Sequence, residues 1–295
     1  MKKLSIISFL TYFVLSSAFC FSQEVSKKEI RKQQRKDRDK YLETGFGGSI
    51  VKAVDNATSP LMYKGFAPST SINYLVHSEK VIKALETDFS FGFLNSRTES
   101  PWYQQQNTSI IFNIRFYKLY QLRRIFKEKV NWYLGGEVFI NSHFRINTKY
   151  GNSAFNFEGY TGLAASTRFE FPLSYKARKV KIWFMKFNRR DRDLRLSFQT
   201  SLPIVNYLVR PTYVTVTNFI DPELQSAITK DHTYGGFFVP FSIRTNTELF
   251  YILHNQNMLK LSYAWTFFSH NPGYNKVQTA THNFMFSYIF KFNQK

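Results

Sequence analysis

The stretch from His282 to Phe292 reads HNFMFSYIFKF, and this pattern decides the fold class. Within it an aromatic residue occupies every second position: Phe284, Phe286, Tyr288, Phe290 and Phe292. Successive side chains of a β-strand point to opposite faces, so all five rings lie on one side of an extended chain. The alternation therefore predicts a strand with one strongly apolar face.

The same period of two recurs along most of the chain. In residues 85–93 one face carries Leu85, Thr87, Phe89, Phe91 and Phe93, and the other carries Glu86, Asp88, Ser90 and Gly92. Residues 108–116, 163–173 and 241–253 repeat the pattern. One face of each segment suits lipid and the other suits water, as in a strand of a membrane barrel.

We predict ten strands, separated by connections of alternating length. The strands are placed at residues 42–53, 66–77, 82–95, 107–119, 130–141, 158–173, 193–204, 240–253, 258–269 and 279–292. The odd-numbered connections are long: 54–65, 96–106, 142–157, 205–239 and 270–278. Residues 77–80 and 254–257 form short turns, whereas the even-numbered connections 120–129 and 174–192 are longer. If Val180–Phe187 and Tyr213–Phe219 also pair, the count becomes twelve.

The composition favours a bilayer environment for these strands. The chain has 32 Phe and 18 Tyr among 295 residues, and outer-membrane barrels carry aromatic girdles at both interfaces. No apolar run after residue 23 approaches the roughly 20 residues of a membrane helix. We therefore predict an all-β, closed antiparallel transmembrane β-barrel with both termini in the periplasm. The alternative is a soluble β-sandwich with one wet face.

The N-terminus has the pattern of an export signal. Lys2 and Lys3 precede an apolar stretch from Leu4 to Leu15, and a more polar stretch ends near Gln23. Residues 1–23 are predicted to be a cleaved signal peptide, although Leu4–Phe21 is also long enough for an uncleaved anchor. Residues 24–41 then form a basic periplasmic tail and residues 42–295 the barrel. The single cysteine, Cys20, lies in the signal, so a processed chain has no disulfide, thiolate metal site or cysteine nucleophile.

Two of these stretches also resemble a known family. The segment from His282 to Phe292 resembles the C-terminal strand by which outer-membrane β-barrel proteins are recognised for assembly, although Asn293, Gln294 and Lys295 follow it. The Ser22–Gln23 end of the signal resembles those common in Bacteroidota. The resemblance implies a Gram-negative outer-membrane protein inserted by the barrel-assembly machinery. It implies no functional subfamily.

The formal net charge of +20 is concentrated in three segments. Residues 24–41 carry +4, residues 118–129 carry +4 and residues 174–195 carry +7, counting Lys and Arg against Asp and Glu. In the predicted topology all three lie at the periplasmic end. This basic rim could contact anionic lipid headgroups, peptidoglycan or an acidic periplasmic partner, or could simply be solvated. Export disfavours nucleic acid as a partner.

The inward faces of the predicted strands carry charges of both signs. Six acids face six bases: Glu43, Glu86, Asp88, Glu137, Glu170 and Glu248 against Arg115, Arg168, Arg195, Arg244, Lys260 and Lys291. Side chains fill a barrel of about eight strands, and open porins have about sixteen. We expect a charge network in a narrow lumen, formed by Glu86, Asp88, Arg115, Glu137, Arg168, Glu170, Arg195, Arg244 and Glu248. The alternative is a path for small solutes lined by the same residues.

Motifs for catalysis or cofactors are weak. The six histidines show no metal-ligand spacing and no glycine-rich phosphate loop is present, so we expect no metal and no cofactor. Ser269 and His282 are expected to face lipid on neighbouring strands, and a lipid hydrolase is a remote alternative on that basis. Asp221, Pro222 and Glu223 predict a short helix to about Thr229, inside the longest connection.

The sequence thus predicts a non-enzymatic integral protein of the outer membrane with a narrow or plugged lumen. It would act by binding a ligand or partner through its external loops or its basic rim. A passive channel for small polar solutes is the alternative function.

Overall fold

The computed structural model describes most of the chain from residue 38 onward. The described residues are 38–56, 59–96, 105–147, 149, 155–175, 178–182, 185–189, 192–210, 233–273 and 276–292. No helix within these ranges is long and apolar enough to cross a membrane. The predicted signal peptide at residues 1–23, nearly all of the basic tail, and the predicted helix after Asp221 lie outside these ranges.

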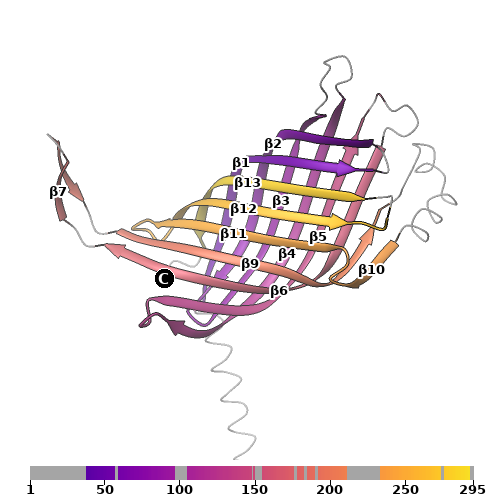
Figure 1. Cartoon of the computed structure of the whole chain (residues 1–295). Helices are drawn as coiled ribbons and strands as arrows, with labels where there is room; N and C mark the ends of the chain where they lie inside the picture. The colour runs from indigo at the N-terminus through magenta and orange to yellow at the C-terminus, as the bar shows by residue number, and fades with distance from the viewer. Residues whose placement is uncertain are drawn as a thin grey trace, which may run out of the picture. The chain divides into compact units, whose positions relative to one another are not determined.

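The described chain is almost entirely β-strand (Figure 1). The strands are β1 (Asp39–Asp55), β2 (Ser59–His77), β3 (Val81–Ser96), β4 (Gln106–Ile125), β5 (Val130–Ile146), β6 (Phe155–Tyr175), β7 (Arg178–Ile182), β8 (Met185–Arg189), β9 (Arg192–Val209), β10 (Thr233–Phe237), β11 (Phe241–Ile252), β12 (Met258–His270) and β13 (Val277–Lys291).

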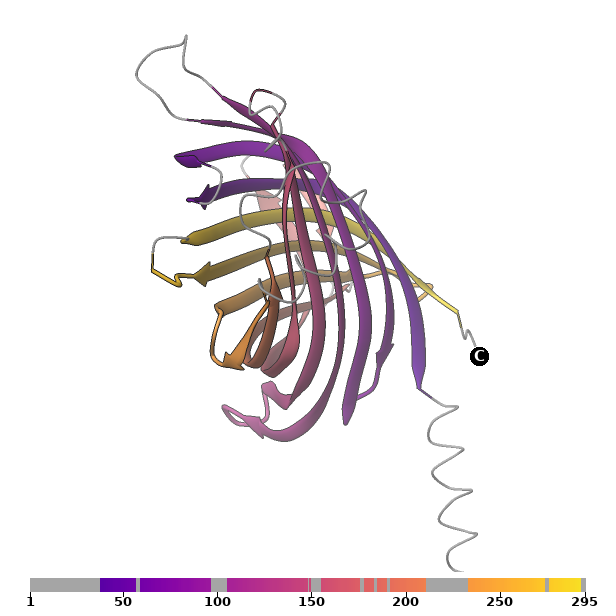
Figure 2. The same ribbon diagram turned by 90° about the vertical axis from the view of Figure 1, so that its right-hand side faces the viewer.

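Ten of these strands form a closed antiparallel ring. Its order is β9, β11, β12, β13, β1, β2, β3, β4, β5 and β6, and a pairing between β6 and β9 closes it. The last strand, β13, pairs with the first, β1, so yellow lies beside indigo in Figures 1 and 2. The ten-stranded barrel predicted from the alternation is confirmed, and the alternative of a β-sandwich is wrong because the strands close into a single ring.

The alternative of twelve barrel strands is wrong for the described residues. The stretch 180–187 contributes to a separate two-stranded sheet, in which β7 pairs only with β8. The short β10 pairs with residues 205–209 of β9, and β11 pairs with residues 193–201 along the same edge of β9. β10 therefore continues the line of β11 and adds no position to the ring. The other proposed strand, 213–219, lies outside the described residues.

The strands continue farther than the alternation alone suggested. β1 ends at Asp55 and β2 begins at Ser59, so a predicted twelve-residue connection shrinks to residues 56–58. β5 and β6 likewise extend to Ile146 and Phe155, which are paired with each other. We call the end of the barrel where β1 ends and β2 begins the loop end. The opposite end, where β1 begins, is called the terminal end. The added strand length extends the wall around the interior at the loop end.

Burial is reversed relative to a water-soluble protein. Large apolar side chains on the outside are exposed, among them Phe46 (66%), Ile72 (63%) and Phe66 (60%). Carboxylates and guanidinium groups on the inside are buried, among them Glu170, Arg168 and Arg115. Charged residues are rarely buried in soluble domains, whereas membrane barrels alternate an apolar outer face with a polar interior. The outer face is therefore suited to acyl chains.

Candidate functional site

The interior of the barrel is the candidate site, because side chains from opposite walls meet there at three levels. The lower level lies near the terminal end. His77 Nε2 on β2 lies 3.2 Å from Glu170 Oε2 on β6 and 3.0 Å from Arg195 Nη1 on β9. β2 and β9 are five positions apart in the ring of ten, so this contact joins opposite sides of the barrel.

A chain of ion pairs extends the lower level around the interior. Lys260 Nζ lies 2.6 Å from Glu43 Oε1 and 3.2 Å from Glu248 Oε1. The guanidinium group of Arg168 then binds Glu248 at 2.8 Å and Glu170 at 3.0 Å. Apolar side chains pack at the same end in two clusters, one around Tyr133 and one around Phe250. The side chains of the lower level therefore lie across the bore at the terminal end.

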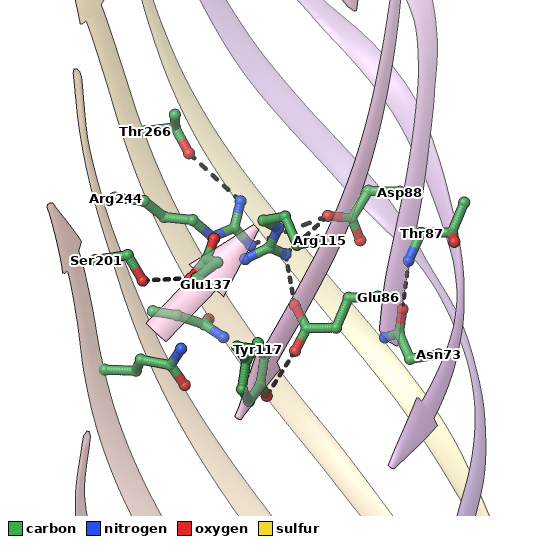
Figure 3. Close-up of polar contacts among 12 residues, drawn as sticks. Asn73, Glu86, Thr87, Asp88, Arg115, Tyr117, Glu137, Ser201, Arg244 and Thr266 are labelled. Carbon is green, nitrogen blue, oxygen red and sulfur yellow. Dashed lines mark hydrogen bonds and ion pairs between the residues drawn. The ribbon is translucent and has the colours of Figure 1, made fainter. Parts of the chain in front are cut away.

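The middle level is centred on Arg115 (Figure 3). Its Nη2 atom lies 2.6 Å from Glu86 Oε2 and 3.1 Å from Asp88 Oδ2, and both carboxylates belong to the neighbouring strand β3. Arg244 reaches toward Asp88 from β11 on the opposite side of the ring, at 3.9 Å. Glu137 Oε2 accepts hydrogen bonds from Ser166 and Ser201.

The upper level lies at the loop end and is centred on Asp55. Arg145 Nη2 lies 2.6 Å from Asp55 Oδ2, and the same guanidinium group forms two bonds to Glu158, at 2.7 and 2.8 Å. Asn156 donates to Asp55 at 2.9 Å, and Arg210 pairs with its other carboxylate oxygen. All of these side chains are buried. Because β1 lies opposite β6, these contacts also cross the bore.

A β-bulge in β9 turns Arg210 inward. Leu163 pairs with Val205 but Ala164 pairs with Pro203, so β9 has one extra residue at this point. Before the bulge the odd-numbered residues Ser197 and Ser201 are buried, and after it the even-numbered Asn206, Leu208 and Arg210 are buried. A shift of one residue exchanges the two faces of a strand. Without the bulge the Arg210 side chain would lie on the outer face.

Ser109, His143 and Glu158 have the connectivity of a hydrolase triad. Ser109 Oγ lies 2.8 Å from His143 Nε2, and His143 Nδ1 lies 3.4 Å from Glu158 Oε1. A triad serine must contact the substrate carbonyl, but Ser109 is completely buried at 0% exposure. Glu158 is in addition bound by Arg145 through both of its oxygens. In this structure Ser109 is not exposed to a substrate, and Glu158 belongs to the ion pairs of the upper level.

A chamber lies between the middle and upper levels. Its empty volume is about 880 Å³, including space open to solvent, with Arg115, Glu137 and Arg244 on its middle-level side and His143 and Glu158 on its upper-level side. Two smaller cavities, of about 330 and 260 Å³, lie farther toward the terminal end among Glu43, Glu248 and Lys260. The free space therefore narrows from the loop end to the terminal end.

The nine residues expected in the lumen all come from barrel strands. Seven of them form the ion pairs described above. Glu137 accepts hydrogen bonds from two serines. Arg195 contacts His77, and its Cζ atom lies 4.6 Å from the centroid of the Phe250 ring. The nine residues are thus divided between the lower and middle levels, with Glu43 and Lys260 joining the lower one.

Sequence reasoning missed the whole upper level. Asp55 and Arg145 were assigned to loops, and Arg210 lies beyond the end predicted for its strand. The alternation of buried residues does continue as far as Arg145: Glu137, Phe139, His143 and Arg145 are all buried on one face of β5. Following the period of two to its last residue would have placed Arg145 inside, whereas nothing local marked the bulge before Arg210.

The proposed hydrolytic pair, Ser269 and His282, is not brought together. Ser269 is paired with Gln278, four residues before His282 on the same strand, which is about 13 Å at roughly 3.3 Å per residue. Ser269 Oγ accepts a hydrogen bond from Gln278, and His282 Nδ1 lies 2.8 Å from the hydroxyl of Tyr263. These two residues therefore cannot act on one substrate atom.

Comparison with known proteins gives similarity of fold without similarity of sequence. No family model and no curated protein matches the sequence. The solved structures that resemble it are bacterial outer-membrane β-barrels of varied roles. The outer membrane protease OmpT from Escherichia coli is 10% identical, with 86% of this chain and 97% of that chain covered and a TM-score of 0.41. Neisserial surface protein A is 8% identical, with 85% of this chain and 97% of that chain covered and a TM-score of 0.33. The deltaS2 mutant of the monoaromatic hydrocarbon channel TodX is 7% identical, with 86% of this chain and 91% of that chain covered and a TM-score of 0.33.

Proposed function

We propose that this protein is an integral, non-enzymatic barrel of a bacterial outer membrane, whose lumen is closed to solutes and which acts by binding. The exposed apolar outer face supports residence in a bilayer. The contacts across the interior support a closed lumen.

One observation carries the closed lumen: groups from opposite strands come within hydrogen-bonding distance of each other. His77 and Arg195 are 3.0 Å apart although their strands lie on opposite sides of the ring, and Asn156 reaches Asp55 in the same way. Buried charges separated from their partners are costly in a medium of low dielectric constant. A passive channel would require these contacts to part at several levels at once, and this disfavours the alternative function.

The terminal end of the barrel offers a basic surface for binding. The basic segment 118–129 comprises the end of β4 and the turn to β5 at this end, and its Arg123, Arg124 and Lys127 side chains are exposed. The segment 174–195 joins β6 to β9 at the same end. With this end in the periplasm, the basic rim would face anionic headgroups, peptidoglycan or an acidic partner.

Electrical recording tests the closed lumen. Purified protein inserted into planar bilayers is expected to give no discrete conductance steps, because side chains from opposite walls contact each other across the bore in the lower and middle levels. Liposomes carrying it should likewise not swell in isotonic solutions of small sugars.

Insertion has to be shown in the same samples, by a heat-dependent shift in gel mobility and by protection from protease. Stable, single-sized conductance steps from inserted wild-type protein would refute the closed lumen and establish the passive channel. Fractionation of cells that places the protein outside the outer membrane would refute its proposed location.

A further inference from the structure

The chamber between the middle and upper levels has a mixed wall, in which neutral hydrogen-bonding groups lie beside apolar side chains. Eleven serine, threonine and asparagine side chains contribute to its wall, among them Asn113, Asn141, Ser242 and Asn283. The chamber is the largest of the three cavities described above, with an empty volume of about 880 Å³ that includes space open to solvent.

Several polar atoms of the wall have no partner. Ser242 Oγ and Asn283 Oδ1 make no hydrogen bond within the described part of the chain, and the same holds for the Nε atoms of Arg115 and Arg244. Ser242 and Arg115 are nevertheless buried. Leaving a buried donor or acceptor unsatisfied costs about 1–3 kcal/mol. An occupant that both donates and accepts hydrogen bonds would satisfy these atoms.

The charges of the wall argue against a charged occupant. Two guanidinium groups, Arg115 and Arg244, are balanced by two carboxylates, Glu137 and Glu158. An anion in the chamber would face both carboxylates, and a cation would face both guanidinium groups. A purely apolar occupant would leave the unpartnered atoms of Ser242 and Asn283 without water or protein partners.

Three aromatic rings, from β5, β6 and β12, contribute to the wall of the chamber. The ring centroid of Tyr160 lies 5.5 Å from that of Phe139 and 4.5 Å from that of Phe268. All three side chains line the cavity. Such a surface packs against the C–H face of a saturated ring, and surrounding hydroxyl and amide groups then satisfy its polar edge.

We propose that this chamber binds a small neutral polyhydroxylated molecule, of the chemical class of a monosaccharide or cyclitol. The inference deepens the proposed function, on which it rests, by naming an interior ligand site. Access from the loop end requires the contacts of Asp55 with Arg145 and Arg210 to part, because these side chains lie beyond the chamber on that side.

Calorimetric titration of the folded full-length protein tests the proposal. The probes are D-glucose, D-mannose, N-acetyl-D-glucosamine and myo-inositol, with D-glucuronate as the anionic probe and toluene as the apolar one. At least one neutral probe is expected to bind with saturable heat and to raise the melting temperature. Saturable binding of D-glucuronate or toluene alone, or of no probe at all, would overturn the proposal.

Two neighbouring positions on β5 provide a matched pair of variants. Asn141→Trp fills the chamber and should abolish binding, whereas Ile140→Trp places the same ring on the outer face and should leave binding unchanged. Ser242→Ala, a gentler change, should weaken binding by roughly threefold to tenfold through loss of one hydrogen bond. Equal binding by wild type and Asn141→Trp would place the ligand elsewhere and refute the chamber as its site. Conductance measured on the same preparation tests the closed lumen independently.

Discussion

Replacing Arg145 with alanine is expected to destabilise the barrel by about 3–5 kcal/mol, as is typical when one partner of a buried ion pair is removed. Arg145 pairs with Asp55 and forms two bonds to Glu158, and all three side chains are buried. Its loss leaves two carboxylates close together, while Arg210 stays paired with Asp55. Urea titration of the protein folded in lipid vesicles, followed by gel mobility, measures the change.

Arg124 provides the matched control for this experiment. It pairs with Glu79 at 3.6 Å at the surface of the terminal end, and both side chains are exposed. Exposed pairs contribute about 0–1 kcal/mol, so Arg124→Ala should unfold almost as wild type does. Adding Glu158→Gln to Arg145→Ala removes one of the uncompensated charges and should restore part of the stability. Identical urea midpoints for Arg145→Ala and wild type would show that the upper level contributes nothing to stability.

A second large effect is expected on the outer face, at Phe89. This side chain is 44% exposed at the centre of the apolar face of β3. If acyl chains cover that face, Phe89→Arg should destabilise the inserted barrel by about 2–4 kcal/mol, the cost of an arginine near the bilayer midplane. On a face that contacts water, the same change would cost almost nothing. Refolding into vesicles and urea unfolding from them provide the measurement.

Phe126 allows the same substitution to be made outside the barrel wall. It lies in the turn after β4 and is 74% exposed, more than Phe89. Phe126→Arg should therefore leave insertion and stability close to wild type. If the two variants behave alike, the apolar outer face does not contact lipid, and the proposed membrane residence is wrong.

The strands and their faces could be predicted because the alternation of side chains is a local property. The rings at Phe284, Phe286 and Phe290 share a face in any extended chain, whatever lies beside it. The same reasoning placed Arg115, Arg168 and Glu248 inside, where the structure has them buried. Length and strand number then indicated a bore that side chains could fill.

Strand ends were predicted less well because polar and charged residues look alike in a loop and on an inward face. His143, Arg145 and Glu158 lie within or next to a stretch that was assigned to a connection, yet all three are buried inside the barrel. Pairing with neighbouring strands keeps them extended: His143 and Arg145 pair with residues of β4 more than 30 positions earlier, and His143 also pairs with Glu158.

The sequence by itself determined that this chain forms about ten strands with an apolar outer face and a charged inner one, since both follow from a period of two. Only the tertiary structure decided which inner charges meet. Asp55 and Arg210 are 155 residues apart, and they come together through the closure of the ring and one bulge in β9. The chamber depends on the same long-range geometry, because its wall combines side chains from strands that are adjacent only after the barrel has closed.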